Sequence, residues 1–268
     1  MYAAFSQDYD RFVNWPARLA TEMPFIEQQL QAADLPLESK SRVTGSRRAL
    51  QVLDSACGTG MHAIALAQKG YMSAGADLSA EMIERARANA ADLAVLVRFE
   101  TVGFGELAGV FGRRAFDALL CLGNSLPHLL THAELAAALD DFSACLRPSG
   151  LLLIQNRNFD AVLARRERWM EPQAHREGET EWLFLRSYDF DPGGLLTFNV
   201  VTLRREGPAP WTQQIATTRL RPLLQTEVLA ALAVAGFTGI TCYGNMAGAP
   251  FDPETSGNLV VAANLPAD

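Results

Sequence analysis

The sequence contains no apolar run long enough to cross a membrane. Met1 is followed by a polar, aromatic segment rather than by the basic and apolar parts of a signal peptide. Positive charge is also in short supply, because 23 Lys and Arg stand against 30 Asp and Glu and the formal net charge is -7. Such a balance is a poor match for the phosphates of DNA or RNA. These absences favour a cytoplasmic protein whose partners are neither membranes nor nucleic acids.

Cysteine is scarce as well. Cys57, Cys121, Cys145 and Cys242 are widely spaced and lie mostly in apolar stretches, so they predict buried thiols rather than disulfides or a metal site. Charged residues make up 20% of the chain and hydrophobic residues 49%, which excludes disorder as the main state. A chain of 268 residues with this composition can bury the core of one large domain with a modest insertion.

From Leu50 onward, short apolar segments alternate with amphipathic ones, and glycine-rich turns separate them. The segments ALQVLD, YMSAGAD, VLVRFETV, FDALLCL and LLLIQN are typical of parallel strands joined by crossover helices. Ser79 is placed to cap the helix after the second strand, and Gly70 to end the helix after the first. The C-terminal segment returns to this pattern with one helix and two strands. The order predicts an α/β fold built on a doubly wound sheet with helices on both faces.

Two segments depart from this alternation. The first has apolar residues at helical spacing and then the polar stretch ESKSRVTGSRR, which predict a helix and a loop. The second shows strand-like alternation in EWLFLRSYDF, LLTFNVVTLRR and WTQQIATTRLR, which predicts an inserted antiparallel sheet. We therefore expect an N-terminal helical lid segment (1–49), a core (50–156), an inserted β roof over the substrate (157–224) and a C-terminal completion of the core sheet (225–268).

Several side chains in these two segments have alternative interpretations. Tyr9, Phe12 and Trp15 either pack the first helix onto the sheet or close over a ligand. Aromatic residues at alternate positions of the insert are expected to form its core, namely Trp182, Phe184, Tyr188 and Phe190. A basic run is expected to be the solvated face of a helix, namely Arg165, Arg166 and Arg168.

Gly58 and Gly60 lie where the first strand turns into a helix, a place where the backbone approaches a ligand closely. The segment GTGMHA also matches the dinucleotide pattern GxGxxA, so a nicotinamide enzyme is one interpretation. Asp54 precedes the turn, and Asp77 ends the second strand, where an acidic residue accepts hydrogen bonds from ribose hydroxyls. Two carboxylates that bracket the loop suit a ligand with a positive centre and no pyrophosphate. Singly, the same residues are also explained by a tight turn and a helix cap.

Two polar residues are candidates for the chemistry. Arg157 follows an apolar strand at its carboxyl end, where a guanidinium can hold a carboxylate with two parallel hydrogen bonds. The alternative is a structural ion pair with Asp160 or a nearby glutamate. His128 lies near the predicted site and can serve an acceptor hydroxyl.

The motifs resemble those of a known family. VLDSACGTGMHAIALAQKG is similar to the first motif of class I S-adenosylmethionine-dependent methyltransferases, GADLSAEMIERAR to the second, and FDALLCL and LRPSGLLLI to later strands. The resemblance implies a Rossmann-like seven-stranded sheet, S-adenosyl-L-methionine as cofactor with S-adenosyl-L-homocysteine as product, and no metal. The positions it implies for cofactor binding are Arg18, Asp54, Ala56, Gly58, Gly60, Asp77, Leu78, Phe104, Leu122 and His128.

A closer resemblance involves CLGNSLPHL and LLLIQNRNFD. These segments are similar to CLGNSFAHL and LLVIDHRNYD of the glycine N-methyltransferase and glycine/sarcosine methyltransferase group. The resemblance implies that Asn124 and Arg157 hold the substrate carboxylate and that His128 lies along the cofactor, which makes Asn124 and His128 the candidate catalytic residues. It also implies that Phe104 packs against adenine and that Arg18 grips the methionine carboxylate.

Three positions depart from that group. Gln155 and Asn156 stand where the group has aspartate and histidine, and Phe159 replaces a tyrosine. These changes leave a carboxylate clamp in place and weaken the case for glycine itself. The sequence therefore favours methyl transfer to a small molecule, with an amino acid or another carboxylate-bearing amine preferred.

Other functions remain open at this point. In the same fold, the chain could methylate oxygen or carbon of a sugar or natural product. A non-catalytic subunit that binds a partner protein is the alternative from another class, and a nicotinamide oxidoreductase is the third. The sequence leaves a homo-oligomer open.

Overall fold

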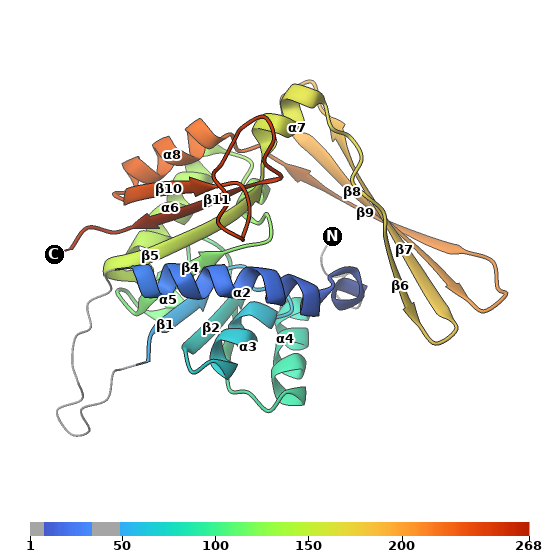
Figure 1. Cartoon of the computed structure of the whole chain (residues 1–268), viewed down its shortest axis with the longest axis horizontal. Helices are drawn as coiled ribbons and strands as arrows, with labels where there is room; N and C mark the ends of the chain where they lie inside the picture. Colours follow the sequence, from blue (N-terminus) through green and yellow to red (C-terminus); the bar gives the residue numbers. More distant parts are fainter. Residues whose placement is uncertain (1–7, 34–48, 268) are drawn as a thin grey trace.

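The computed structural model describes residues 8–33 and 49–267, which form a seven-stranded sheet with helices on both faces and a separate four-stranded sheet (Figure 1). The first seven residues and most of the predicted loop after the N-terminal helix lie outside the described residues. The α/β class predicted from the alternating pattern is confirmed.

The large sheet has the strand order β10-β11-β5-β4-β1-β2-β3. Its five central and edge strands β1 to β5 are parallel, whereas β11 is antiparallel to both β5 and β10. The strand bounds are β1 Gln51–Asp54, β2 Met72–Asp77, β3 Arg98–Thr101, β4 Phe116–Cys121, β5 Leu146–Arg157, β10 Thr238–Tyr243 and β11 Asn258–Asn264. The chain leaves β1 toward β2 on one side and returns to β4 on the other, so the direction of winding reverses between β1 and β4. Ligands of such sheets bind outside the carboxyl ends of the strands at this point.

Two sets of helices bury the two faces of this sheet. Alternate residues of a strand face opposite sides, and Val52 and Leu53 of β1 accordingly belong to different core clusters. One face packs against α2 Trp15–Ala32, α3 Met61–Gln68 and α4 Ala80–Asp92. The other face packs against α5 Leu107–Phe111, α6 His132–Cys145 and α8 Gln225–Val234. Both faces are covered, which is why the central strand β4 is buried along its whole length, whereas the edge strand β3 is mostly polar.

Helix ends follow the local signals in the sequence. The Ser79 hydroxyl accepts a hydrogen bond from the Met82 amide at 3.3 Å, so the predicted cap of α4 is confirmed. Gly70 follows α3 with φ +90, a conformation that favours glycine. Asn14 caps α2 by accepting a hydrogen bond from the Ala17 amide at 3.2 Å. The four cysteines are free thiols, and three of them are buried, namely Cys57, Cys121 and Cys145.

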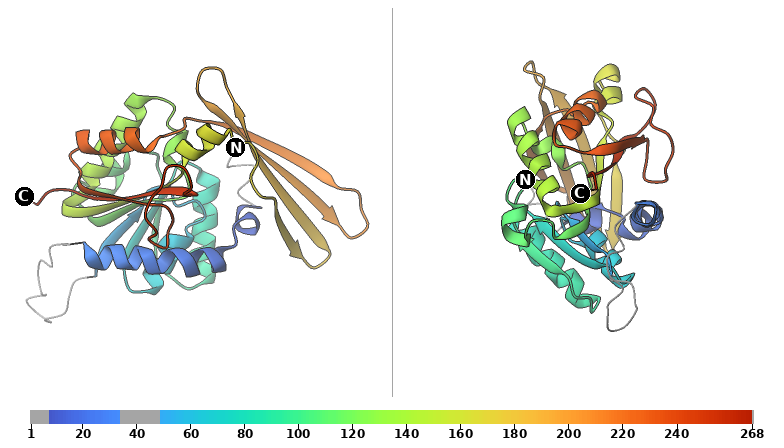
Figure 2. Two further views of the ribbon diagram at one scale, coloured as in Figure 1. Left: turned by 45° about the horizontal axis from the view of Figure 1, so that its top comes forward. Right: turned by 90° about the vertical axis from the view of Figure 1, so that its left-hand side faces the viewer.

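The insert is the four-stranded antiparallel sheet, in the order β6-β7-β8-β9. Its strands are β6 Gln173–Glu177, β7 Thr180–Phe190, β8 Leu196–Glu206 and β9 Thr212–Leu220. Three of these strands match the predicted alternation, while β6 was not predicted. Figures 1 and 2 show this sheet beyond the carboxyl end of the large sheet, with its far end projecting away from the body of the molecule. The sheet returns to the core where the Arg221 amide donates to the Pro127 carbonyl at 2.8 Å.

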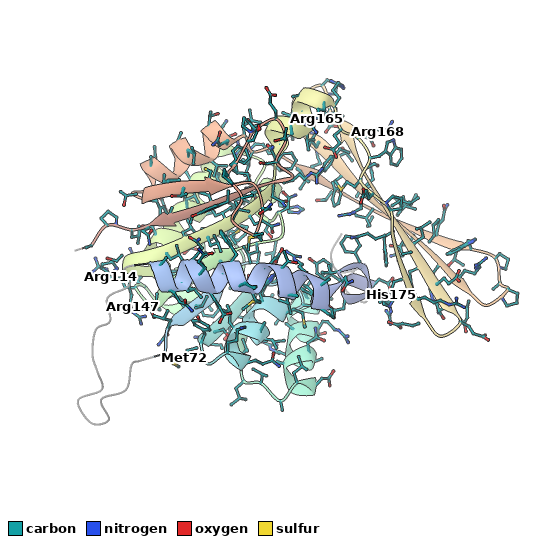
Figure 3. All side chains as sticks on the ribbon, in the orientation of Figure 1. Met72, Arg114, Arg147, Arg165, Arg168 and His175 are labelled. Carbon is teal, nitrogen blue, oxygen red and sulfur yellow. The ribbon has the colours of Figure 1, made fainter. Side chains whose placement is uncertain are left out.

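The predicted helix around the basic run is shorter than expected. Helix α7 spans Phe159–Arg165, and Arg166 ends it with φ +49. Arg168 therefore lies outside the helix, where it pairs with Asp189 at 2.6 Å. Figure 3 shows Arg165 and Arg168 at the outer surface near the start of the insert, so this run does not face the ligand-binding end of the core.

Candidate active site

Two adjoining cavities lie at the carboxyl ends of the large sheet. The inner cavity, of about 430 Å³, lies along the ends of β1, β2 and β4. The outer cavity, of about 550 Å³, lies between the end of β5 and the inward face of the insert. Four residues line both cavities and form the boundary between them, namely Tyr9, Arg18, Gly123 and His128. A molecule in one cavity therefore meets a molecule in the other at this boundary.

The glycine loop forms the floor of the inner cavity. Gly58 has φ +53, and its amide donates a hydrogen bond to the Asp77 carboxylate at 2.9 Å. Gly60 is not among the lining residues, because its side-chain space is taken by the core. A Cβ at Gly60 would lie 2.7 Å from the ring of Phe99 and 2.8 Å from Ala86. Gly60 thus has a packing role, and its expected cofactor contact stays a prediction.

Asp54 is the most perturbed acid of the inner cavity. Its side chain is 1% exposed, and neither carboxylate oxygen has a hydrogen-bond partner among the described residues. Burial raises the pKa of Asp54 to about 6, and the negative charge of Asp77 adds to the shift while His62 opposes it. A buried carboxylate without a partner is suited to a cationic ligand.

Asp77 lies at the end of β2 with both oxygens turned to backbone amides. It accepts hydrogen bonds from Gly58 and from Ser79, each at 2.9 Å. Burial raises the pKa of Asp77, and these two bonds offset part of that rise. A carboxylate can accept about four hydrogen bonds, so capacity for two hydroxyl donors remains.

The remaining implied cofactor positions form an apolar wall around the inner cavity. Ala56, Leu78, Phe104 and Leu122 all line it. Phe104 packs edge-on against Phe142 with ring centroids 5.4 Å apart. Leu78 is 80% exposed at the mouth, where a flat aromatic ligand would cover it.

Arg18 enters from α2 and is held by residues that sequence reasoning missed. Its Nε donates to both oxygens of Glu22 at 3.0 and 3.1 Å, and Glu22 is bonded to His62 at 2.6 Å. A Cβ built at Gly123 would lie 3.7 Å from the Arg18 guanidinium, which places that group at the end of β4. The spacing of Arg18 and Glu22, one helical turn apart, was the available signal.

His128 ends a short 3₁₀ helix, Leu126–His128, and lies on the boundary of the two cavities. Burial lowers the pKa of His128 to about 4. Its imidazole is therefore uncharged at neutral pH.

Asn124 and Arg157 lie together in the outer cavity, and the role implied for them in holding the substrate carboxylate stays a prediction. The backbone of Asn124 has φ +67, and its side-chain oxygen accepts a hydrogen bond from the Arg157 amide at 2.8 Å. The Arg157 guanidinium donates to Glu167 at 2.7 Å. The alternative interpretation of Arg157 as an ion-pair partner is thus observed, although the partner is Glu167 and the pair lines the cavity.

The N-terminal segment covers both cavities. Tyr9 lies over the glycine loop, since a Cβ at Gly58 would be 3.6 Å from its ring. Asp10, which sequence reasoning missed, binds the segment to the core. Its carboxylate accepts hydrogen bonds from Trp15, Thr59, Arg85 and Asn89 at 2.6 to 3.1 Å.

The inward face of the insert also contributes a charge that was missed. Trp182, Phe184 and Tyr188 are buried, as predicted for alternate positions of β7. Arg186 lies on the same face of the strand and lines the outer cavity, as does Tyr188. A charged residue in the middle of an apolar alternation, at W-F-R-Y-F, was the signal that could have identified it.

Within residues 8–33 and 49–267, the structure holds no cluster of three potential metal ligands from His, Cys, Asp or Glu. No helix among these residues is long and apolar enough to cross a membrane.

Known proteins share this sequence and architecture. A family model described as "Methyltransferase domain" matches residues 52–150. A glycine/sarcosine N-methyltransferase of Halorhodospira halochloris is 32% identical over 59% of this chain and 54% of its own length. Proteins of the same name from Aphanothece halophytica and Parasynechococcus marenigrum are 29% and 31% identical, over 90% and 75% of this chain. The chain spans about half of the first relative, 81% of the second and 69% of the third.

Other relatives act on sugars by name. A dTDP-3-amino-3,6-dideoxy-alpha-D-glucopyranose N,N-dimethyltransferase of Streptomyces fradiae is 34% identical over 61% of this chain and 55% of its own length. The structure of the sugar N-methyltransferase KedS8 from Streptoalloteichus has a TM-score of 0.70 at 20% identity, covering 100% of this chain and 93% of its own.

A Clostridium acetobutylicum S-adenosylmethionine-dependent methyltransferase has a TM-score of 0.76 at 16% identity and covers 99% of both chains. Structural similarity at such low sequence identity supports the fold alone. The assignment to a family depends on the relatives found by sequence. Together with the glycine loop and the strand order, they show that this chain belongs to the class I S-adenosylmethionine-dependent methyltransferases.

Proposed function

We propose that the protein methylates the amine of a small, carboxylate-bearing acceptor such as an amino acid. The observation that carries the proposal is the boundary shared by the two cavities, where His128 faces both. A methyl donor in the inner cavity and an amine in the outer cavity would meet there. Proximity and orientation of this kind supply a large part of the acceleration of a displacement reaction.

The residues of the inner cavity fit S-adenosylmethionine. The unpartnered carboxylate of Asp54 suits a cationic amino group, and the Arg18 guanidinium suits a carboxylate. Asp77 retains acceptor capacity for ribose hydroxyls, and Phe104 and Leu78 form an apolar wall for adenine. When bound, the cofactor supplies an electrophilic methyl group on a sulfonium.

The protein's own residues orient the acceptor and exclude water. Asn124 and Arg157 lie at the end of β5, where the carboxylate of an amino acid would be held. The amine can arrive neutral, so no base is required before transfer. The pKa of His128, about 4, keeps its imidazole uncharged at neutral pH, so the boundary carries no added positive charge beside the cationic methyl donor. Tyr9 and Phe12 of the N-terminal segment cover the boundary and exclude water.

A sugar or other natural product is the second candidate acceptor. The outer cavity, of about 550 Å³, is larger than glycine requires, and its lining includes the aromatic rings of Phe12, Tyr188 and Phe198. The similarity to sugar N-methyltransferases supports the same alternative.

The proposal is tested with S-adenosylmethionine labelled on its methyl group, offered with separate panels of amino acids, amines, amino sugars and phenolics. We expect label to transfer to the nitrogen of amino acids or related carboxylate-bearing amines. Gly58→Val provides the control, because a branched side chain at φ +53, facing Tyr9, should obstruct the inner cavity and abolish transfer. Transfer confined to sugars or phenolics would replace the proposed acceptor class with the second candidate.

A further inference from the structure

Arg186 occupies an unusual position for a charged side chain. It lies in the middle of β7 between Phe184 and Tyr188, two buried aromatic residues on the same face of the strand. That face forms the wall of the outer cavity opposite the end of β5. A guanidinium at this position is removed from most of the solvent, and a buried charge is costly unless another group compensates it.

No anionic side chain among the described residues compensates the charge of Arg186. Within the described part of the chain, the Arg186 side chain has neither a hydrogen bond nor an ion pair, and its Nε is fully buried without a partner. Its guanidinium carbon lies 4.9 Å from the centre of the Phe12 ring. This cation–π contact uses the flat face of the guanidinium. The donor edges of a guanidinium held in this way remain available for an acceptor.

The other two arginines of the outer cavity each have a carboxylate partner from the protein, and Arg18 also lines the inner cavity. Arg18 is bonded to both oxygens of Glu22, and Arg157 is bonded to Glu167 at 2.7 Å. Glu171 also lines the cavity, but it is exposed and does not lie within ion-pair distance of Arg186. Among the described arginines of this cavity, Arg186 is therefore the one without a carboxylate partner.

We infer that Arg186 is the anion receptor of the acceptor cavity and binds the carboxylate of the methyl acceptor. The inference rests on the proposed function and changes one assignment within it, because Arg186 takes the place of Arg157 as the residue that binds the acceptor carboxylate. The Arg157–Glu167 pair becomes a positioning pair that shapes the end of β5. The rings of Phe12 and Tyr188 flank the receptor, so acceptors with an apolar portion next to the carboxylate fit better than glycine.

Calorimetry with phenylacetate as a probe tests this assignment. The protein is first saturated with S-adenosylhomocysteine and then titrated with phenylacetate at low ionic strength. We expect Arg186→Gln to weaken phenylacetate binding by about tenfold or more, because it removes a charge-assisted hydrogen-bond donor. Arg186→Lys should bind phenylacetate with an affinity between those of the native protein and Arg186→Gln, since lysine keeps the charge and loses the planar guanidinium fork.

The matched control is Arg168→Gln, which removes an arginine that lies outside the cavity and pairs with Asp189 at 2.6 Å. We expect it to change phenylacetate affinity by less than about threefold, well under the tenfold loss expected of Arg186→Gln. The double variant Arg157→Gln with Glu167→Gln tests the alternative receptor, because it removes the neighbouring pair without leaving a lone charge. The neutral amide phenylacetamide should bind all forms equally weakly.

Undiminished phenylacetate binding by Arg186→Gln would overturn the inference, as would an equal loss in Arg168→Gln, a larger loss in the double variant than in Arg186→Gln, or no phenylacetate binding by the native protein. Native affinity of each variant for S-adenosylhomocysteine shows that the variant is folded. No S-adenosylhomocysteine binding by the native protein would instead contradict the proposed function, so the two failures are distinguishable.

Discussion

Asp54 shows how a binding residue can destabilise the protein that contains it. The Asp54 carboxylate is held in the core next to a second carboxylate, Asp77, and no hydrogen bond reaches it from the part of the chain that the structure describes. Its pKa rises from 3.8 to about 6. A shift of this size corresponds to roughly 3 kcal/mol, to order of magnitude, by which the charged form disfavours the folded state at neutral pH. The cationic cofactor would relieve that penalty, so the group is suited to binding rather than to stability.

We predict that Asp54→Asn raises the free energy of unfolding of the ligand-free protein at pH 7.5 by about 1 to 3 kcal/mol, because it removes the buried charge. Since the folded pKa is raised, protonation of Asp54 stabilises the native protein fully below pH 3.8, and this stabilisation is lost as pH rises through about 6. Urea unfolding at pH 5.5 and 7.5 should therefore show a smaller gain at the lower pH. Equal or lower stability of Asp54→Asn at pH 7.5 would contradict this account.

Single residues differed in how well the sequence revealed them. Asp54, Gly58 and Asp77 were identifiable because one strand-turn-helix unit contains or adjoins them, so their spacing is set locally. Asp10 and Glu22 were missed because their partners are distant in sequence, and nothing in their own segments marks those partners.

At the scale of elements, the N-terminal segment is a cover attached to the cofactor loop at one residue. The Asp10 carboxylate joins this segment to Thr59 of the loop and to Arg85 and Asn89 of α4. Burial by itself would raise the pKa of Asp10, but its hydrogen bonds outweigh burial and lower the pKa overall. The carboxylate thus remains ionised and bonded at neutral pH.

Asp10→Ala should loosen this cover and weaken S-adenosylhomocysteine binding by about tenfold or more, because several hydrogen bonds worth about 1 kcal/mol each are lost. Calorimetry measures the affinity, and limited proteolysis measures the exposure of the segment. Asp8→Ala is the matched control, since Asp8 pairs with Arg11 at 3.1 Å on the same short helical segment. Equal affinities of the two variants would show that Asp10 does not hold the cover.

The sequence predicted that the insert is an antiparallel sheet, but it did not predict strand β6 or the cavity that the insert lines. Alternation along β7, β8 and β9 predicted strands, whereas β6, with its mostly exposed residues, carries no such pattern. The predicted alternation also located the aromatic face of β7 without showing that this face lines a cavity. Only pairing between strands and packing against the end of β5 decide that.

At the scale of the whole molecule, two sheets and an N-terminal cover enclose one continuous site. The large sheet lines the inner cavity, and the insert lines the outer cavity. Because these parts come together only in the folded chain, a ligand of the inner cavity binds the native state and stabilises it by mass action.

We predict that S-adenosylhomocysteine, at one hundred times its dissociation constant, stabilises the protein by about 2.7 kcal/mol and raises its melting temperature by about 5 °C or more. Thermal unfolding followed by fluorescence measures the shift. NAD is the control ligand, because the dinucleotide interpretation of GTGMHA would require it to stabilise the protein. A shift with NAD and none with S-adenosylhomocysteine would reverse the assignment of the inner cavity.

The sequence by itself determined the α/β order, the cofactor loop and its two acidic partners. These features are set by signals within single strand-turn-helix units, where spacing along the chain and spacing in the structure coincide. The tertiary structure alone decided which charges face the outer cavity. Phe12, Arg157 and Arg186 come from three distant segments, and their meeting depends on how the insert packs over the sheet. The same packing neutralises Arg157 with Glu167 and leaves Arg186 uncompensated, a difference that no local pattern records.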